Sequence, residues 1–184
     1  MSRTWDVAPR GHSRYASAME PTLRSDRFAI LTARATCHAC NTPIAVSALL
    51  VPAYVEWHDD EWVSVDESAL LTYVEAVDEA TRSVWTTRAP QILPAASKTA
   101  DLTYLANVCA CGALQGDWYL TEPDGPFFPL ENAGIAAIEV DWVEAPIAAR
   151  AGASMSSWTE ALIARSPFPG WVPTPPPKAR RRRR

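Results

Sequence analysis

The sequence predicts an α+β fold on three observations. Runs rich in Ile, Val, Leu and Tyr alternate with short turn sequences, as in β-strands. Two closely spaced cysteine pairs interrupt these runs at turns. Two further segments, 78–90 and 155–166, carry capping residues and helical periodicity. The chain has 184 residues and is 48% hydrophobic, enough for one domain with a packed core.

The chain divides into a body and two polar ends. Residues 1–25 are mixed and show no periodicity, so we expect a disordered N-terminal arm. Residues 166–184 are rich in proline and then in arginine, a composition that cannot bury a core and predicts a disordered tail. The globular domain is therefore expected at 26–165.

Six strands are expected in the body, at 27–36, 42–57, 68–77, 104–109, 116–122 and 134–143. The spacing in 68–77 would also suit a helix. Asp78 is placed to cap a helix over 78–90, and Pro90 marks its end. A second helix over 155–166 begins near Ser156 or Ser157 and has one apolar face.

The cysteines predict a metal site. Cys37 and Cys40 form a CxxC turn between two expected strands, and Cys109 and Cys111 form a CxC turn between two others. Four thiolates from two such turns can surround one Zn²⁺ as a tetrahedron. The fold is therefore expected to consist of zinc-ribbon β-hairpins with a large β/α insertion and a C-terminal helix, and the zinc is expected to be structural.

Other interpretations of the cysteines stay open. A CxxC pair can be a redox dithiol, although such pairs usually open a helix, and here Pro43 and a β-rich run follow. The thiols can also be buried without a metal. His38, between Cys37 and Cys40, can supply a nitrogen in place of one sulfur, which matters because the one-residue spacing of Cys109 and Cys111 can strain a tetrahedron.

Three stretches together resemble a group of uncharacterised bacterial zinc-ribbon proteins. They are CHACNTP (37–43), LLTYVEAV (70–77) and SKTADLTYLANVCACGALQGDWYLTEPDGPFFP (97–129). The group pairs a CxxC knuckle followed by Thr-Pro with a later segment of the form NxCxxCGAxQGDxxL. The resemblance covers about 28–130 and implies a zinc-ribbon element and a bound Zn²⁺, but no reaction. This chain differs in its CxC second knuckle and in having His38 and Ala39 between its first two cysteines.

Two groups of polar residues admit a catalytic interpretation. Asn107, Gln115 and Asp117 flank the second cysteine turn, where Asn107 can instead bond the loop amides, and Gln115 or Asp117 can tie the ribbon to the insertion. His58 lies among carboxylates and between two tryptophans in EWHDDEW (56–62), a pattern that favours a solvated hairpin turn over an acid–base pair. The sequence contains no glycine-rich phosphate loop. An enzymatic role therefore stays open, but no catalytic residue is predicted.

Charge is distributed unevenly along the chain. Of 17 Lys and Arg residues, six lie in 178–184, which leaves 11 against 21 Asp and Glu in the rest of the chain. The basic residues of this segment are Lys178, Arg180, Arg181, Arg182, Arg183 and Arg184. They can bind nucleic acid through phosphates, or an acidic partner, whereas the acidic body would repel phosphates.

These observations predict a non-enzymatic interaction or adaptor protein with a structural zinc site and a protein partner. The alternative is a nucleic-acid-binding zinc-ribbon protein that uses the arginine-rich tail. No apolar run approaches the ~20 residues of a membrane-spanning helix, and no secretory signal is recognisable at the N-terminus. We therefore expect a cytoplasmic protein, with its cysteines reduced.

Overall fold

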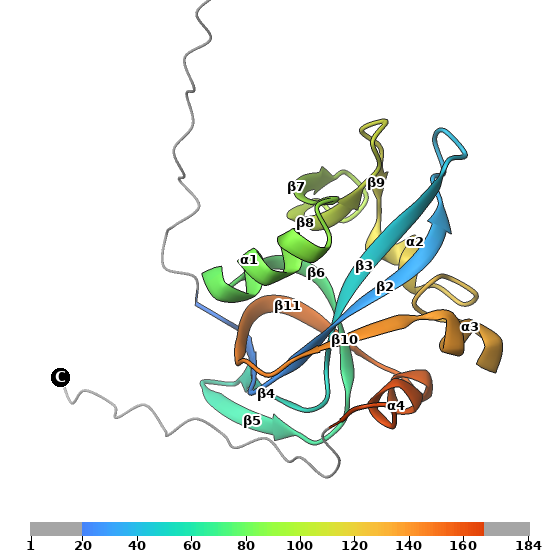
Figure 1. Cartoon of the computed structure of the whole chain (residues 1–184). Helices are drawn as coiled ribbons and strands as arrows, with labels where there is room; N and C mark the ends of the chain where they lie inside the picture. The colour runs from blue at the N-terminus through green and yellow to red at the C-terminus, as the bar shows by residue number, and fades with distance from the viewer. Residues whose placement is uncertain (1–19, 168–184) are drawn as a thin grey trace, which may run out of the picture.

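The computed structural model describes residues 20–167, which form eleven strands and four short helices (Figure 1). The protein is mostly β, with less helix than the expected α+β class. An eight-stranded antiparallel sheet curls into an open half-barrel, and a three-stranded sheet lies beside it. The large sheet runs, in spatial order, β10 (Glu139–Val143), β2 (Phe28–Thr36), β3 (Pro43–Val51), β6 (Ala69–Val77), β11 (Ile147–Met155), β1 (Leu23–Ser25), β4 (Tyr54–His58) and β5 (Glu61–Val65). The small sheet runs β7 (Ile92–Ser97), β8 (Leu102–Val108) and β9 (Leu114–Gln115).

The expected strands at 27–36, 68–77 and 104–109 are confirmed as β2, β6 and β8. The expected single strand over 42–57 is wrong, because the chain bends at Pro52 and continues as a separate strand, β4. Proline has no N–H to donate to a strand ladder, so it favours such an interruption. β3 pairs with β2 and β6, whereas β4 pairs with β1 and β5.

The helix predicted over 78–90 is confirmed as α1 (Glu79–Arg88). Asp78 caps it, because its carboxylate accepts hydrogen bonds from the backbone N–H and the hydroxyl of Thr81. The C-terminal helix is confirmed as α4 (Ser157–Ile163), with Ser156 at the N-cap position and with Trp158 and Leu162 buried.

The expected strands at 116–122 and 134–143 need correction. The first is a short helix, α2 (Asp117–Thr121), and the second divides into helix α3 (Asn132–Ala137) and strand β10. In α2, Leu120 is buried while its neighbours Trp118 and Tyr119 are exposed. One helical turn brings Leu120 into the core, whereas the two-residue alternation of a strand would have buried Trp118 on the same side.

Four strands, β1, β7, β9 and β11, lie outside the expected ones. β1 lies within the last residues of the expected N-terminal arm (1–25) and fills a position between β11 and β4. β7 contains a proline, and β11 consists largely of alanine and other small residues, so neither carries a strong β signal. The rest of the arm and the tail from residue 168 lie outside the described residues.

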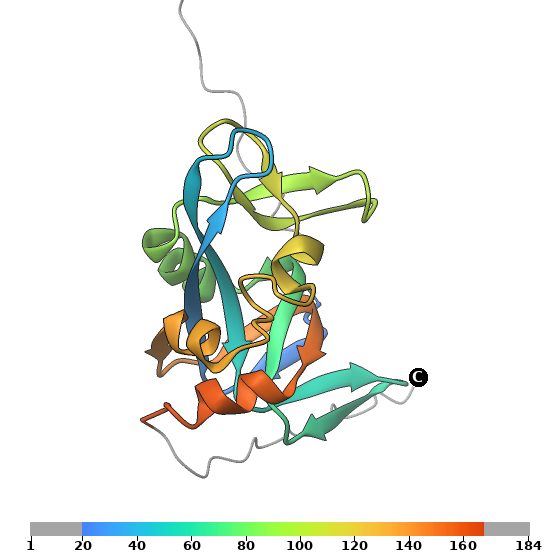
Figure 2. The ribbon, with the colours of Figure 1, turned by 90° about the vertical axis from the view of Figure 1, so that its right-hand side faces the viewer.

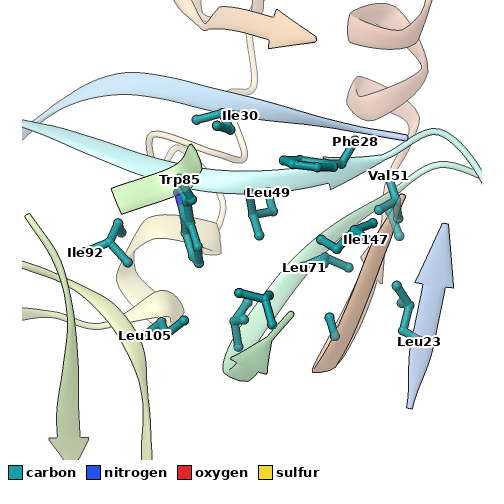
Figure 3. Packing of buried hydrophobic residues seen from close by; sticks show 14 of the residues in the cluster. Leu23, Phe28, Ile30, Leu49, Val51, Leu71, Trp85, Ile92, Leu105 and Ile147 are labelled. Atoms are coloured by element: carbon teal, nitrogen blue, oxygen red, sulfur yellow. The ribbon is translucent and has the colours of Figure 1, made fainter. Parts of the chain in front are cut away.

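The core has two parts, one on each face of the large sheet. Leu49 belongs to the first part and its neighbour Leu50 to the second, as the alternation along β3 requires. Figure 3 shows the first part, where Trp85 of α1 and Ile92 of β7 pack toward Leu49. Helices α2, α3 and α4 cover the other face (Figure 1). No helix in residues 20–167 is long and apolar enough to cross a membrane.

Candidate metal centre

The first cysteine turn closes the β2–β3 hairpin. The backbone N–H of Cys37 donates to the carbonyl of Thr42 at 3.0 Å, and the N–H of Asn41 donates to the carbonyl of Cys37 at 2.9 Å. Asn41 has a φ of 57°, and asparagine tolerates this left-handed conformation better than most residues. The turn therefore brings the side chains of Cys37 and Cys40 together on one side of the loop.

The second cysteine turn joins β8 to β9 in the small sheet. The N–H of Cys109 donates to the carbonyl of Ala113 at 2.9 Å, and the N–H of Gly112 donates to the carbonyl of Cys109 at 2.8 Å. Gly112 has a φ of 87°, a conformation in which side chains are strained. This turn is the counterpart of the first, with glycine in the left-handed position that Asn41 occupies there.

The two hairpin tips extend from the same end of the molecule and lie side by side (Figures 1 and 2). The four Sγ atoms of Cys37, Cys40, Cys109 and Cys111 all lie within 4.8 Å of one another. Cys37 and Cys109 are buried, and Cys40 and Cys111 are exposed. The structure thus forms one candidate metal site from two cysteine turns in different sheets.

The distances between sulfurs fit a tetrahedral ion. Cys37 Sγ lies 3.7 Å from Cys111 Sγ, and Cys40 Sγ lies 3.8 Å from Cys109 Sγ. Four sulfurs at about 2.3 Å from a central Zn²⁺ are about 3.8 Å apart. Each of these two pairs joins one turn to the other, so an ion at their centre would link the two sheets. Although Cys109 and Cys111 are separated by one residue only, their sulfurs still reach those of Cys40 and Cys37.

Polar groups around the cluster favour thiolates. The side-chain amide of Gln115 is buried and donates to Cys37 Sγ at 3.4 Å. Cys40 Sγ lies 3.4 Å from Thr42 Oγ1, close enough for the hydroxyl to donate to a thiolate. Such donors spread the negative charge that four sulfurs bring to an ion.

The thiol pKa values differ within the cluster. Hydrogen bonds from the hydroxyl and the amide of Thr42 lower the pKa of Cys40 to about 6. A hydrogen bond from the backbone of Cys40 holds the pKa of Cys37 below its usual value. A backbone hydrogen bond from Ala113 lowers the pKa of Cys111, but the neighbouring thiols, Cys40 and Cys109 first, outweigh it and raise the pKa to about 12. Four thiols this close cannot all ionise unless a cation offsets their charge.

Asn107, Gln115 and Asp117 contact protein groups. Asn107 is buried and bonded to the backbone of Ser47 in the large sheet, and Gln115 contacts the cysteine cluster. Asp117 Oδ2 accepts from the N–H of Tyr73 at 2.6 Å. Burial raises the pKa of Asp117 to about 6, although this hydrogen bond lowers it. Asn107 therefore bonds to β3 and not, as expected, to the amides of the cysteine loop. Asp117 ties the segment after the second cysteine turn to β6, as expected, whereas Gln115 contacts the first cysteine turn.

The described histidines lie outside the cluster of ligand atoms. His38 is exposed, and its ring stacks against that of Tyr119, with 6.5 Å between the ring centroids. His58 lies at the end of β4, where it contacts Asp59 at 3.4 Å. The expected hairpin over 56–62 is confirmed, and Trp57 lies opposite Trp62 across it. The basic residues of 178–184 lie outside the described residues.

Sequence reasoning found all four cysteines but not the part that Thr42 plays beside Cys40. A threonine two residues after a cysteine in a turn is a recognisable signal, because its hydroxyl and N–H can both reach the sulfur.

Compared with known proteins, the chain matches no protein-family model, no curated protein sequence and no solved structure. The similarity to bacterial zinc-ribbon proteins therefore remains a resemblance carried by the motifs, and the functional argument depends on the site itself.

Proposed function

We propose that this protein binds one structural Zn²⁺ through Cys37, Cys40, Cys109 and Cys111, and that it serves as a non-enzymatic interaction protein. The convergence of four sulfurs from two turns within 4.8 Å carries the proposal. Zinc suits four thiolates in a tetrahedron better than other common divalent ions of the cell. Bound there, the ion would join the β2–β3 hairpin to β8 and β9 in the manner of a zinc ribbon.

A structural role follows from the number of ligands. Four protein thiolates close the coordination shell of zinc, whereas catalytic zinc sites keep one position for water or substrate. A second reason for a structural role is that the polar side chains of Gln115 and Thr42 form hydrogen bonds with sulfurs of the cluster. Free thiols with this geometry also favour a reducing compartment, and we propose the cytoplasm.

Exposed aromatic residues beside the cluster support a protein partner. Trp118 and Tyr119 of α2 are 66% and 65% exposed. Tyr119 stacks against His38 of the first cysteine turn, so the aromatic surface extends from α2 to the metal site. Large exposed aromatic side chains in one place are typical of binding surfaces. The ion would then hold this surface in shape.

The alternative function, nucleic-acid binding, depends on residues 178–184. Residues 20–167 contain eight Lys and Arg against 20 Asp and Glu, a balance that repels phosphates. We therefore prefer a protein partner. A duplex and a single-stranded oligonucleotide titrated at low and moderate salt test the alternative, since binding that disappears when the basic residues of 178–184 are replaced by glutamine would support it.

Metal analysis of the purified full-length protein tests the zinc site. We expect about one zinc per chain, and Co²⁺ in its place should give the strong visible absorption of tetrahedral cobalt thiolates. His38→Ala is the control, because it changes the first cysteine turn without removing a sulfur and should retain the metal. A metal-free protein with intact thiols would contradict the proposal.

Affinity capture from the native host tests the interaction surface. Trp118→Ala with Tyr119→Ala should lose the captured protein while still binding zinc. Leu93→Ala, at an exposed apolar position in β7, is the control and should keep it. Equal capture by all three proteins would show that α2 is not the binding surface.

A further inference from the structure

The β4–β5 hairpin presents an aromatic face at the edge of the large sheet. Its register places Val55 opposite Ser64 and Trp57 opposite Trp62, all on one face. The two tryptophan rings meet edge to face, 5.5 Å apart, and Trp57 is 42% exposed. The guanidinium of Arg24 lies 5.0 Å from the centroid of the Trp62 ring. We call Arg24, Trp57, Trp62 and Ser64 the hairpin face; Val55 points to the same side but is buried.

Carboxylates flank this face at the hairpin tip (Asp59 and Asp60) and after β5 (Asp66 and Glu67), while Glu56 and Glu61 alternate to the other face of the hairpin. The segment 56–67 contains six of the 21 Asp and Glu residues of the chain, and all six are exposed: Glu56, Asp59, Asp60, Glu61, Asp66 and Glu67. The face therefore combines flat apolar rings with a strongly negative border. A ligand that complements it must offer apolar surface and positive charge together.

We propose that the hairpin face is a docking site for basic, proline-rich segments, and that residues 168–184 of this chain are its occupant. This segment contains four prolines in 173–177, followed by Lys178 and Arg180 to Arg184. Proline rings pack on tryptophan in recognition of proline-rich peptides. The basic residues complement the carboxylates of 56–67, and arginine also stacks on aromatic rings, as Arg24 does here. The site is separate from the metal centre and does not depend on it.

The segment is long enough to reach the hairpin. The hydroxyls of Ser68 and Thr159 lie 2.8 Å apart, which fixes the first turn of α4 beside the start of β6, three residues after β5 ends. From Thr159 to Pro167 the chain covers at most about 20 Å. From Ser68 to the hairpin tip at Asp60 it covers about 27 Å. The sum, about 47 Å, is an upper limit on the distance from Pro167 to the hairpin tip. The 17 residues of 168–184 extend to about 56 Å, which is longer than that limit.

The figures agree with this estimate. α4 and the β4–β5 hairpin lie at the same end of the molecule, away from the tips that carry the cysteines (Figures 1 and 2). The segment that follows α4 therefore starts on the side of the molecule where the hairpin face lies.

The test uses full-length protein in which Lys178 and Arg180 to Arg184 are replaced by glutamine, so that the site is free. The probe is a fluorescent peptide of residues 168–184, and its anisotropy is measured at about 20 mM and 150 mM salt. We expect the peptide to bind this protein, and to bind the unmodified chain about fivefold or more weakly, because its own segment occupies the site.

Paired charge variants locate the site. Asp59→Asn, Asp60→Asn and Glu61→Gln together should weaken peptide binding about five- to tenfold, since exposed ion pairs contribute modestly. Asp59 and Asp60 have φ values of 46° and 65°, which asparagine tolerates. The control combines Asp101→Asn, Asp124→Asn and Glu131→Gln, with the same change in charge and two aspartates at φ values of 49° and 68°. It should leave binding within about twofold.

NMR of the intact chain gives an independent readout. The indole N–H signals of Trp57 and Trp62 should shift between the unmodified protein and the glutamine variant of the basic segment. The proposal is overturned if both charge triples weaken the peptide equally, if the peptide does not bind at low salt, or if the indole signals do not move. It is also overturned if sedimentation shows that the segment joins two copies of the chain.

Discussion

Asn107 forms two hydrogen bonds with the backbone of Ser47: its Oδ1 accepts from the N–H at 2.7 Å and its Nδ2 donates to the carbonyl at 2.9 Å. A side chain of the small sheet thus pairs with a strand of the large sheet as a neighbouring strand would. Ser47 Oγ in turn accepts from the indole N–H of Trp85 in α1 at 3.0 Å. The junction of the two sheets is therefore held by a buried polar network.

Asn107→Ala should lower the free energy of unfolding by about 2–4 kcal/mol, because it leaves the N–H and the carbonyl of Ser47 buried without partners. Urea denaturation followed by far-UV circular dichroism measures the change. Asn132→Ala, at an exposed position in α3, is the control and should change stability by less than about 0.5 kcal/mol. Equal effects of the two substitutions would show that the network does not stabilise the junction.

Cys40→Ser or Cys109→Ser should release the zinc and lower the melting temperature by about 10 °C or more. Each substitution removes a ligand, and the free energy of metal binding is also folding free energy. Metal analysis and thermal denaturation of the same samples measure both effects, and a chelator added to the unmodified protein should reproduce them. Unchanged melting in both variants would mean that the cysteines do not hold a stabilising ion.

Gln115→Ala should weaken zinc binding about 10- to 100-fold while leaving one zinc per chain at saturation. The substitution removes the amide that donates to Cys37 Sγ, and such outer contacts tune metal affinity. Competition with a chromophoric chelator measures the affinity. Gln91→Ala serves as the control, because that side chain donates to the carbonyl of Ala45 and does not contact sulfur in any described interaction. A matching loss in both variants would contradict a specific role for Gln115.

Asp117→Asn should stabilise the protein at pH 7 and remove part of its pH dependence. Burial raises the pKa of Asp117 from 3.8 to about 6. The folded state therefore holds this proton more tightly than the unfolded state, so stability is lost as the pH rises from about 4 to 6. The loss is about 3 kcal/mol. Asparagine stays neutral, and its carbonyl can still accept from the N–H of Tyr73.

The measurement compares the free energies of unfolding of the two proteins at several pH values between 4 and 7, so that contributions from the thiols cancel. The difference between the variant and the unmodified protein should grow from about pH 4 to pH 6 and then level off. A constant difference would show that Asp117 does not titrate in this range.

Local chemistry determined which parts of this protein the sequence could predict. Cys37 and Cys40 stand at a turn between two strongly β-forming runs, so a hairpin with both thiols at its tip follows from neighbouring residues alone. The helix capped by Asp78 and the tryptophan pair at the β4–β5 turn depend on residues only a few positions apart. In the same way, the four cysteines could be predicted to form one site because two thiols per turn leave a tetrahedral shell half filled.

Only the tertiary structure decided how these parts meet. The bond between Asn107 and Ser47 joins residues 60 apart, and that between Gln115 and Cys37 joins residues 78 apart, distances over which periodicity carries no information. The segment 116–122 has the composition of a strand, but packing of Leu120 into the core made it a helix. The small residues of β11 form a strand because β6 and β1 supply partners on both sides. Long-range burial and hydrogen bonding therefore overrode local preference wherever that preference was weak.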